Sequence, residues 1–195
     1  MKKHKKLLII ILLVILVAAA AISAFLLKKH MRAEAAGAEN LVVEFLDGYK
    51  AKDPAVTDLT MQAMEGDTFT YEASSAIFAE NFKYEIVDAK KVESNLYLVD
   101  ITASNIDFEK LFTSAFDAFS AQQENADAAV DFETVLNEKI TAKDYVTKDF
   151  TCSVTVLKFG DDYKLNLDGE LANAMTGGMN EYLASLQTQQ TQGGE

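Results

Sequence analysis

The chain has 195 residues, with one cysteine, one proline, two histidines and no tryptophan. Because Cys152 is the single cysteine, no internal disulfide can form. Both histidines, His4 and His30, lie within the first 32 residues, so the remainder has no imidazole. That remainder therefore cannot build a Ser-His or Cys-His nucleophilic site, or a zinc site that requires histidine.

Positive charge is scarce beyond residue 32. All 30 acidic residues lie there, together with 11 of the 18 basic residues, which leaves a net charge of −19. A protein that binds nucleic acid needs a basic surface to displace counterions, so this class of partner is excluded. The same charge argues against a domain lying flat on anionic lipid. It is compatible with a cation or a basic partner, or with a role in solubility alone.

A long apolar run is present near the N-terminus. Leu7 to Leu27 contains 21 residues without a charge, and Ser23 is its only polar side chain. As a helix it would span about 31 Å, which is close to the hydrocarbon thickness of a bilayer. The alternative is a signal peptide cleaved near Ala24, but the apolar part of such peptides is usually ~7–15 residues long. The length favours a retained anchor, and the lack of a nearby cysteine excludes a lipid anchor.

The charges that flank this run predict the orientation. Four lysines precede it, and two lysines and one arginine follow it, which slightly favours an N-terminus inside the cell. We therefore expect a single-pass protein of the cell membrane whose C-terminal domain lies outside the cytoplasm. The predicted parts are an anchor with its flanks (1–32), an α+β soluble domain (33–186) and a disordered Gln/Gly-rich tail (187–195).

Apolar spacing predicts the elements of the soluble domain. Helical spacing occurs over six segments: 33–52, 54–66 with Asp53 as N-cap, 71–80, 108–119, 131–143 and 169–186, the last weakened at Gly177-Gly178. Alternation predicts two antiparallel hairpins, formed by the segments 82–90, 96–106, 150–159 and 163–167. The expected fold is therefore α+β, with a curved antiparallel sheet around the first long helix and a helical insertion between the hairpins.

Three stretches carry a resemblance to a known family: Glu44–Asp53, Val99–Phe108 and Lys158–Leu165. They are similar to stretches in the uncharacterised extracytoplasmic domains of Gram-positive bacteria that belong to the nuclear-transport-factor-2-like (cystatin-like) superfamily. The resemblance implies a cone-shaped fold and a location at the cell surface, but no activity. The chain departs from these relatives in two ways, because Tyr163 stands where they often have tryptophan and because it lacks their lipidated cysteine.

Enzymes with this fold place catalytic groups inside the cone, where Asp100, Tyr84 or Tyr97 would be the candidates. Asp100, however, shares a strand face with Thr102 and Ser104, which predicts a solvated or hydrogen-bonded carboxylate. The two tyrosines are expected to be packing residues with a hydrated hydroxyl. No catalytic, cofactor-binding or metal-binding residue is therefore assigned.

Other conspicuous residues also have structural explanations. Cys152 alternates with apolar residues and has no cationic neighbour in sequence, which indicates a small core side chain. Asp161-Asp162 suits a turn, since a calcium loop needs more oxygen ligands. Within Asn105–Asp107, Asp107 is expected to cap the following helix. The apolar stripe of Phe108–Phe119 is predicted to face the core, the alternative being a surface for a partner helix or a lipid.

Three functional hypotheses remain. The first is a tethered extracytoplasmic binding or interaction domain without a catalytic site, whose protein or small-molecule ligand the sequence does not identify. The second is a receptor or enzyme that uses the cone interior, which predicts a roomy pocket with a few polar groups. Filling of that interior by Phe45, Tyr49, Tyr84 and Tyr97 would count against it. The third is a secreted domain, released by cleavage near Ala24.

Overall fold

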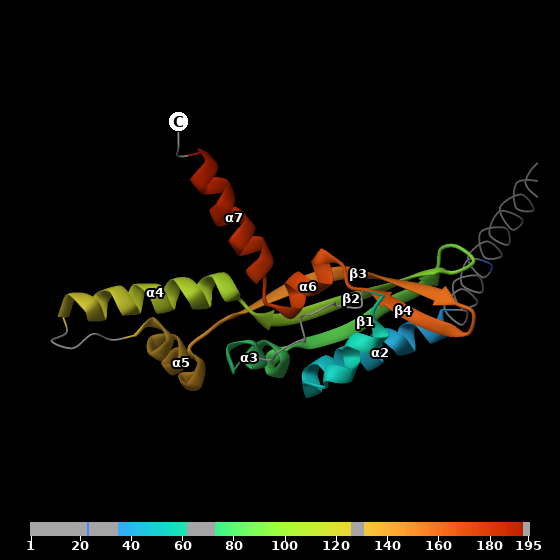
Figure 1. Ribbon diagram of the computed structural model, residues 1–195, viewed down its shortest axis with the longest axis horizontal. Helices are drawn as coiled ribbons and strands as arrows, with labels where there is room; N and C mark the ends of the chain where they lie inside the picture. The colour runs from blue at the N-terminus through green and yellow to red at the C-terminus, as the bar shows by residue number, and fades with distance from the viewer. Residues whose placement is uncertain (1–22, 24–34, 62–72, 126–130, 193–195) are drawn as a thin grey trace, which may run out of the picture.

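The protein is an α+β domain with one four-stranded antiparallel sheet, as the sequence predicts (Figure 1). The computed structural model describes Ser23 and residues 35–61, 73–125 and 131–192. Its elements are α2 (Ala36–Ala51), η1 (Pro54–Leu59), α3 (Ala73–Asn81), β1 (Lys83–Lys91), β2 (Leu96–Ile106), α4 (Phe108–Asn125), α5 (Phe132–Ala142), β3 (Thr147–Phe159), β4 (Asp162–Asn166), α6 (Gly169–Met175) and α7 (Met179–Gln192).

The sheet has the order β1-β2-β3-β4, so each strand pairs with the next one in the chain. The two long central strands, β2 and β3, pair without a shift from Leu96 opposite Leu157 to Ile106 opposite Thr147. Strict alternation along β2 places Tyr97, Val99, Ile101 and Ala103 on one buried face. The predicted strand pattern is confirmed for both hairpins.

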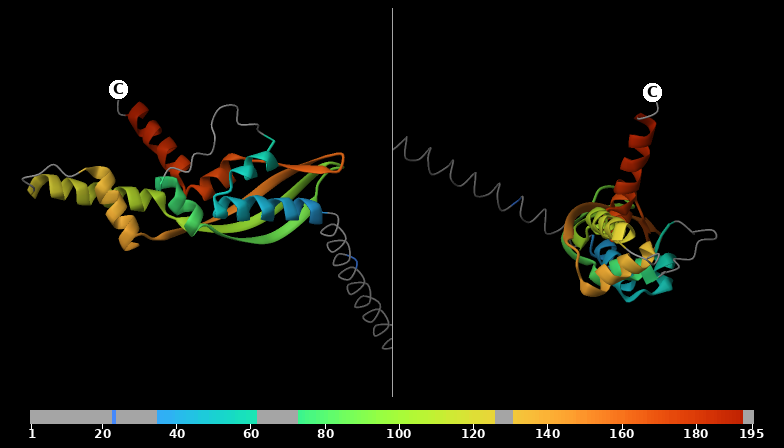
Figure 2. Two further views of the ribbon diagram at one scale, coloured as in Figure 1. Left: turned by 60° about the horizontal axis from the view of Figure 1, so that its bottom comes forward. Right: turned by 90° about the vertical axis from the view of Figure 1, so that its left-hand side faces the viewer.

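Helix α2 packs against the buried face of the sheet and contacts all four strands. Its inward positions are those that the spacing predicts, with Val42, Phe45, Leu46 and Tyr49 all buried. The strands curve around this helix, as Figure 2 shows. Removing a large apolar side chain of this kind from water contributes roughly 1.5–3 kcal/mol. The contact between α2 and the sheet is therefore the main core of the domain.

The C-terminal end of α6 is fastened to this core by hydrogen bonds. The carbonyl oxygen of Met175 accepts from the hydroxyl of Tyr49 at 2.7 Å and from Nδ2 of Asn105 at 2.7 Å. The same Nδ2 donates to the carbonyl oxygen of Ala174 at 3.2 Å, and Oδ1 of Asn105 accepts from the amide of Ile106 at 2.8 Å. Asn105 is fully buried, and these bonds supply the partners that a buried amide and a helix end require.

The predicted helix over 169–186 is in fact two helices. Gly177 and Gly178 have φ angles of +66° and +88°, which end α6 and begin α7 in a new direction. Helix α7 then projects from the body of the domain (Figure 1) and continues to Gln192. The tail predicted to be disordered from residue 187 is therefore helical up to that point, while residues 193–195 lie outside the described part of the chain.

The helix that follows Asp53 is shorter than predicted. The side chain of Asp53 accepts from the amide of Ala55 at 2.9 Å, which confirms the predicted N-cap. The helix is a 3-10 helix that ends at Leu59, because Thr60 is extended and bridges to Leu165 at the edge of β4. Backbone pairing with the sheet thus replaces further helix, and the rest of the predicted segment, up to Gly66, lies outside the described residues.

The predicted membrane anchor is not part of the described structure, apart from Ser23. Leu7–Ile22 and Ala24–Leu27 lie outside the described residues. None of the helices within the described ranges is long and apolar enough to cross a membrane.

Two glycines with the same backbone conformation allow the close packing at Gly177 to be tested. A Cβ atom at Gly177 would lie 2.0 Å from the carbonyl oxygen of Ile106, whereas one at Gly160, which has a φ of +65°, would meet nothing within 4 Å. We expect G160A to lower the free energy of unfolding by about 1–2 kcal/mol, the cost of a left-handed conformation. G177A should lose at least about 2 kcal/mol more, because it adds a steric clash.

Urea unfolding of the full-length variants, followed by circular dichroism, measures this difference. Equal losses for the two variants would show that the contact between Gly177 and Ile106 is not tight.

Candidate functional site

The space between α2 and the sheet is filled by side chains. Phe45, Tyr49 and Tyr97 are at most 4% exposed, and the rings of Tyr49 and Phe82 meet edge to face at 5.6 Å. Tyr84 is half-buried and stacks on Phe82 at 6.2 Å. Phe45, Tyr49 and Tyr97 therefore fill the centre of the cone, which counts against a ligand pocket there, while Tyr84 borders an open hollow at the end of the sheet.

The structure does not bring the three catalytic candidates together. Asp100 lies on the opposite face of the sheet, where it accepts from the hydroxyl of Ser153 at 2.6 Å and pairs with Lys90 at 3.3 Å. It is therefore a hydrogen-bonded, half-buried carboxylate, as its strand face predicts. Tyr97 is buried with its ring 5.7 Å from that of Tyr163, which makes it a packing residue.

Tyr84 is also held in place by a polar contact. Its hydroxyl donates to a carboxylate oxygen of Asp47 at 2.8 Å. Burial raises the pKa of Tyr84 to about 12, and both the hydrogen bond to Asp47 and its negative charge add to this effect. The phenol is therefore protonated at neutral pH, where it can act as a hydrogen-bond donor but not as a base.

Cys152 lies in the main core, under α6. The residue is 3% exposed, and its thiol donates to the carbonyl oxygen of Glu170 at 3.6 Å. Burial raises the pKa of the thiol to about 11, and the negative charges of Glu170 and Asp168 contribute further. A protonated, buried thiol is a poor nucleophile, so Cys152 acts as a small core residue.

The aspartates singled out in the sequence take structural positions. Asp107 caps α4, because one of its carboxylate oxygens accepts from the amide of Lys110 at 3.2 Å. Asp161 lies in the turn that Gly160 begins, and Asp162 opens β4 opposite Phe159. Among the described residues, no group of three or more His, Cys, Asp or Glu could hold a metal ion.

Helices α4 and α5 form a unit of their own beyond the sheet, which we call the helical arm. Its two helices leave the end of the sheet side by side (Figures 1 and 2). The stripe along α4 was expected to face the core, but only Leu111 and Ala115 are buried. Phe108, Phe112 and Phe119 are half-buried, and Phe116 is 53% exposed. The prediction therefore holds in part: most of the stripe packs against neighbouring helices, but α4 extends past the sheet and Phe116 is left exposed.

Aromatic side chains run continuously along the helical arm. Phe112 lies 5.8 Å from Phe108 and 5.3 Å from Phe132, measured between ring centroids. Phe132 then meets Phe119 at 5.8 Å, and Phe119 meets Phe116 at 6.5 Å. Such pairs contribute about 0.5–1.5 kcal/mol each beyond the area they bury. Aromatic contacts thus help to hold the arm together, and the series of rings ends at the exposed Phe116.

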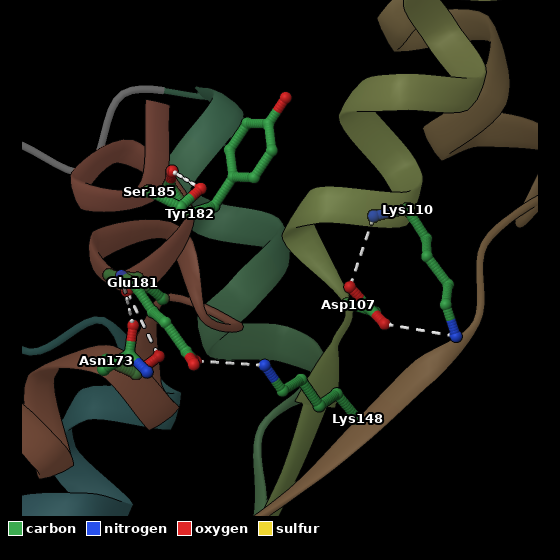
Figure 3. Close-up of polar contacts among 8 residues, drawn as sticks. Asp107, Lys110, Lys148, Asn173, Glu181, Tyr182 and Ser185 are labelled. Atoms are coloured by element: carbon green, nitrogen blue, oxygen red, sulfur yellow. Dashed lines mark hydrogen bonds and ion pairs between the residues drawn. The ribbon is translucent and has the colours of Figure 1, made fainter. Parts of the chain in front are cut away.

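The base of α7 is joined to the arm and to the sheet. The ring of Tyr182 lies 5.9 Å from both Phe108 and Phe112. Figure 3 shows the neighbouring polar contacts, in which Glu181 accepts from Lys148 at 3.1 Å and its amide donates to the side chain of Asn173 at 3.0 Å. The hydrogen bond from Lys148 is the main cause of a lowered Glu181 pKa. These contacts fix the first turn of α7, while residues 183–188 are exposed.

Comparisons of the chain with protein-family models, with curated proteins and with solved structures found no match. The predicted likeness to extracytoplasmic domains of Gram-positive bacteria therefore stays a prediction. The functional proposal below depends on the geometry of the chain itself.

The burial of Cys152 predicts a slow reaction with thiol reagents. A pKa of about 11 makes the thiolate fraction at pH 8 roughly two hundred times smaller than the ordinary value of about 8.5 does. We expect the folded protein to react with a disulfide reagent at least ~100-fold more slowly than the urea-unfolded chain at the same pH.

Ser185 lies exposed on α7, so the S185C variant serves as an internal control. It should show one fast phase and one slow phase in the same sample. A Cys152 that reacts equally fast in the folded and unfolded chains would contradict its assignment to the core.

Proposed function

We propose that this protein is a non-enzymatic binding or interaction domain, held in the cell membrane by Leu7–Leu27 and displayed outside the cytoplasm. The observation that carries the proposal is the exposed aromatic surface of the helical arm. Phe116 is 53% exposed at the end of a continuous series of aromatic rings. Contiguous apolar patches on a protein surface are typical of sites that bind another molecule.

The rest of the domain supports a binding role. The interior between α2 and the sheet is occupied by core side chains. Each catalytic candidate is engaged in packing or in a local hydrogen bond. A sheet that curves around α2 also supports our assignment of the fold to the cystatin-like cones. No cofactor or metal is needed for the activity we propose.

The charge around the arm favours a protein partner over a lipid surface. Glu109 and Asp117 are exposed on α4 next to the aromatic stripe, and Glu133 and Glu138 are exposed on α5. A surface that approaches anionic lipid gains from clustered lysine and arginine, which this one does not offer. Aromatic residues within a polar rim match the anatomy of protein interfaces, where a few such side chains carry most of the binding energy.

The proposed orientation predicts which residues a membrane-impermeant maleimide reaches in intact cells. Wild-type protein should stay unlabelled, because its single cysteine is buried. S185C, on the exposed part of α7, should be labelled without permeabilisation. Lys3→Cys, before the anchor, should be labelled only after permeabilisation. The reverse pattern would place the domain in the cytoplasm.

The mass of the protein recovered from native membranes separates retention from cleavage. An uncleaved chain has a mass of 21.4 kDa. A shorter product that begins near Ala24 would instead support the secreted form.

The role of the arm is tested by a photo-crosslinking amino acid placed at Phe116 and, as a matched control, at Asp117. Both positions are exposed on α4, but neighbouring residues differ by about 100° around a helix and so face different directions. We expect adducts with a partner protein from position 116 in native membranes, at least about fivefold more abundant than from position 117.

F116S should abolish binding of that partner while changing the free energy of unfolding by less than about 1 kcal/mol, because the side chain is largely exposed. Equal crosslinking from both positions would contradict an interface centred on the aromatic stripe.

A further inference from the structure

A separate apolar cavity lies at the base of the helical arm. It has a volume of about 130 Å³, and its wall is formed by side chains of α3, α4, α5 and the first residue of α7. The rings of Phe78, Phe108 and Phe112 form one part of the wall, and aliphatic side chains such as Leu136 and Ile140 form another. The cavity belongs to the second core cluster, away from the packed interior between α2 and the sheet.

The wall offers nothing to a polar ligand. Each of its seven side chains is a phenylalanine, leucine, isoleucine or methionine. A polar molecule that entered would lose its hydrogen bonds to water without replacement, which costs about 1–3 kcal/mol for each group on the scale of mutational data. Water is disfavoured for the same reason, since an ordered water needs two to four polar partners. The chemistry of the wall therefore selects for an apolar occupant.

The volume limits the size of this occupant. A cavity of about 150 Å³ lined by leucine, isoleucine and phenylalanine is known to stay dry and to bind benzene. The space here is of the same order and cannot enclose a drug-sized ligand, whose sites measure about 300–1,000 Å³. The acidic exterior of the arm also disfavours an anionic lipid, which would have to place its headgroup there.

One side of the wall is adaptable. Met179 is its only residue from α7, and it directly follows the two left-handed glycines that set the direction of that helix. Methionine is unbranched and polarisable, so it adjusts to ligands of different outline and contacts aromatic rings favourably. The cavity is partly open to solvent, so a ligand can enter without disturbing the sheet, and Met179 can adjust to its outline.

We infer that this cavity is a binding site for a small, uncharged apolar molecule of about the size of benzene. The inference is independent of the proposed membrane tether and of the proposed protein partner. It assigns to the base of the arm a ligand site that is distinct from the exposed stripe at Phe116. Burying each CH₂-sized group in such a site contributes up to about 0.8 kcal/mol, which limits binding of so small a molecule to the millimolar range.

The test uses the full-length chain in lipid nanodiscs with labelled methyl groups, titrated with benzene at known free aqueous concentrations. We expect saturable NMR shifts of the Met179 and Ile140 methyl signals. Buried Met175 and Leu171, which belong to the main core, should not respond and serve as internal controls. Pyridine, which has the same shape but a ring nitrogen that accepts hydrogen bonds, should bind at least tenfold more weakly.

A substitution that fills the cavity provides a second, separate test. L136F should abolish the response to benzene, whereas L183F, at an exposed position of α7, should leave it unchanged. If L136F does not fold, the wild-type chain still tests the inference. The Met179 and Ile140 signals are compared with those of Met175 and Leu171, and benzene is compared with pyridine. The inference is overturned if Met179 and Ile140 show no saturable shift, if Met175 and Leu171 respond equally, if pyridine binds as well as benzene, or if the response persists in folded L136F.

Discussion

The domain depends on one backbone carbonyl, that of Met175, which is shared by two buried donors. Tyr49 reaches it from α2 and Asn105 reaches it from β2, each at 2.7 Å. The bond from Tyr49 connects the inner helix to α6, and the bond from Asn105 connects the sheet to the same point. Both bonds lie in an apolar core, and a hydrogen bond within a protein contributes about 0.5–1.5 kcal/mol of net stability. The junction therefore sets the position of α6 relative to the two layers beneath it.

The position of α6 in turn determines how the arm and α7 begin. Directly after α6, Gly177 passes so close to the end of β2 that its carbonyl oxygen accepts from the amide of Phe108, the first residue of α4, at 2.9 Å. On the other side, the amide of Asp107 donates to Val146 at 2.9 Å, just before β3. Three segments that are distant in sequence thus meet at the end of β2. Two side chains that line the apolar cavity, Phe108 and Met179, lie at or next to this meeting point.

Much of the fold could be predicted from the sequence, because its signals are local. The alternation in Tyr97 to Ala103 and the helical spacing in Val42 to Tyr49 each place side chains on one face, and both faces are buried. The errors arise where long-range contacts decide the outcome. The 3-10 helix after Asp53 stops at Leu59 because Thr60 pairs with a strand about a hundred residues later. For the candidate site, the stripe on α4 was visible in the sequence, but the exposure of Phe116 was not, since periodicity does not show how far a helix extends beyond its sheet.

The two ends of the arm leave and re-enter the sheet at adjacent points. Ile106 and Thr147 are paired residues, and Asp107 and Val146 are hydrogen-bonded next to them. The segment between Asp107 and Val146 is therefore a long connection between two neighbouring antiparallel strands, β2 and β3. The entropic cost of closing such a connection grows only slowly with its length. Evolution could lengthen, shorten or exchange the arm without changing strand register, so related chains would be expected to share the sheet and α2 while differing most in the arm.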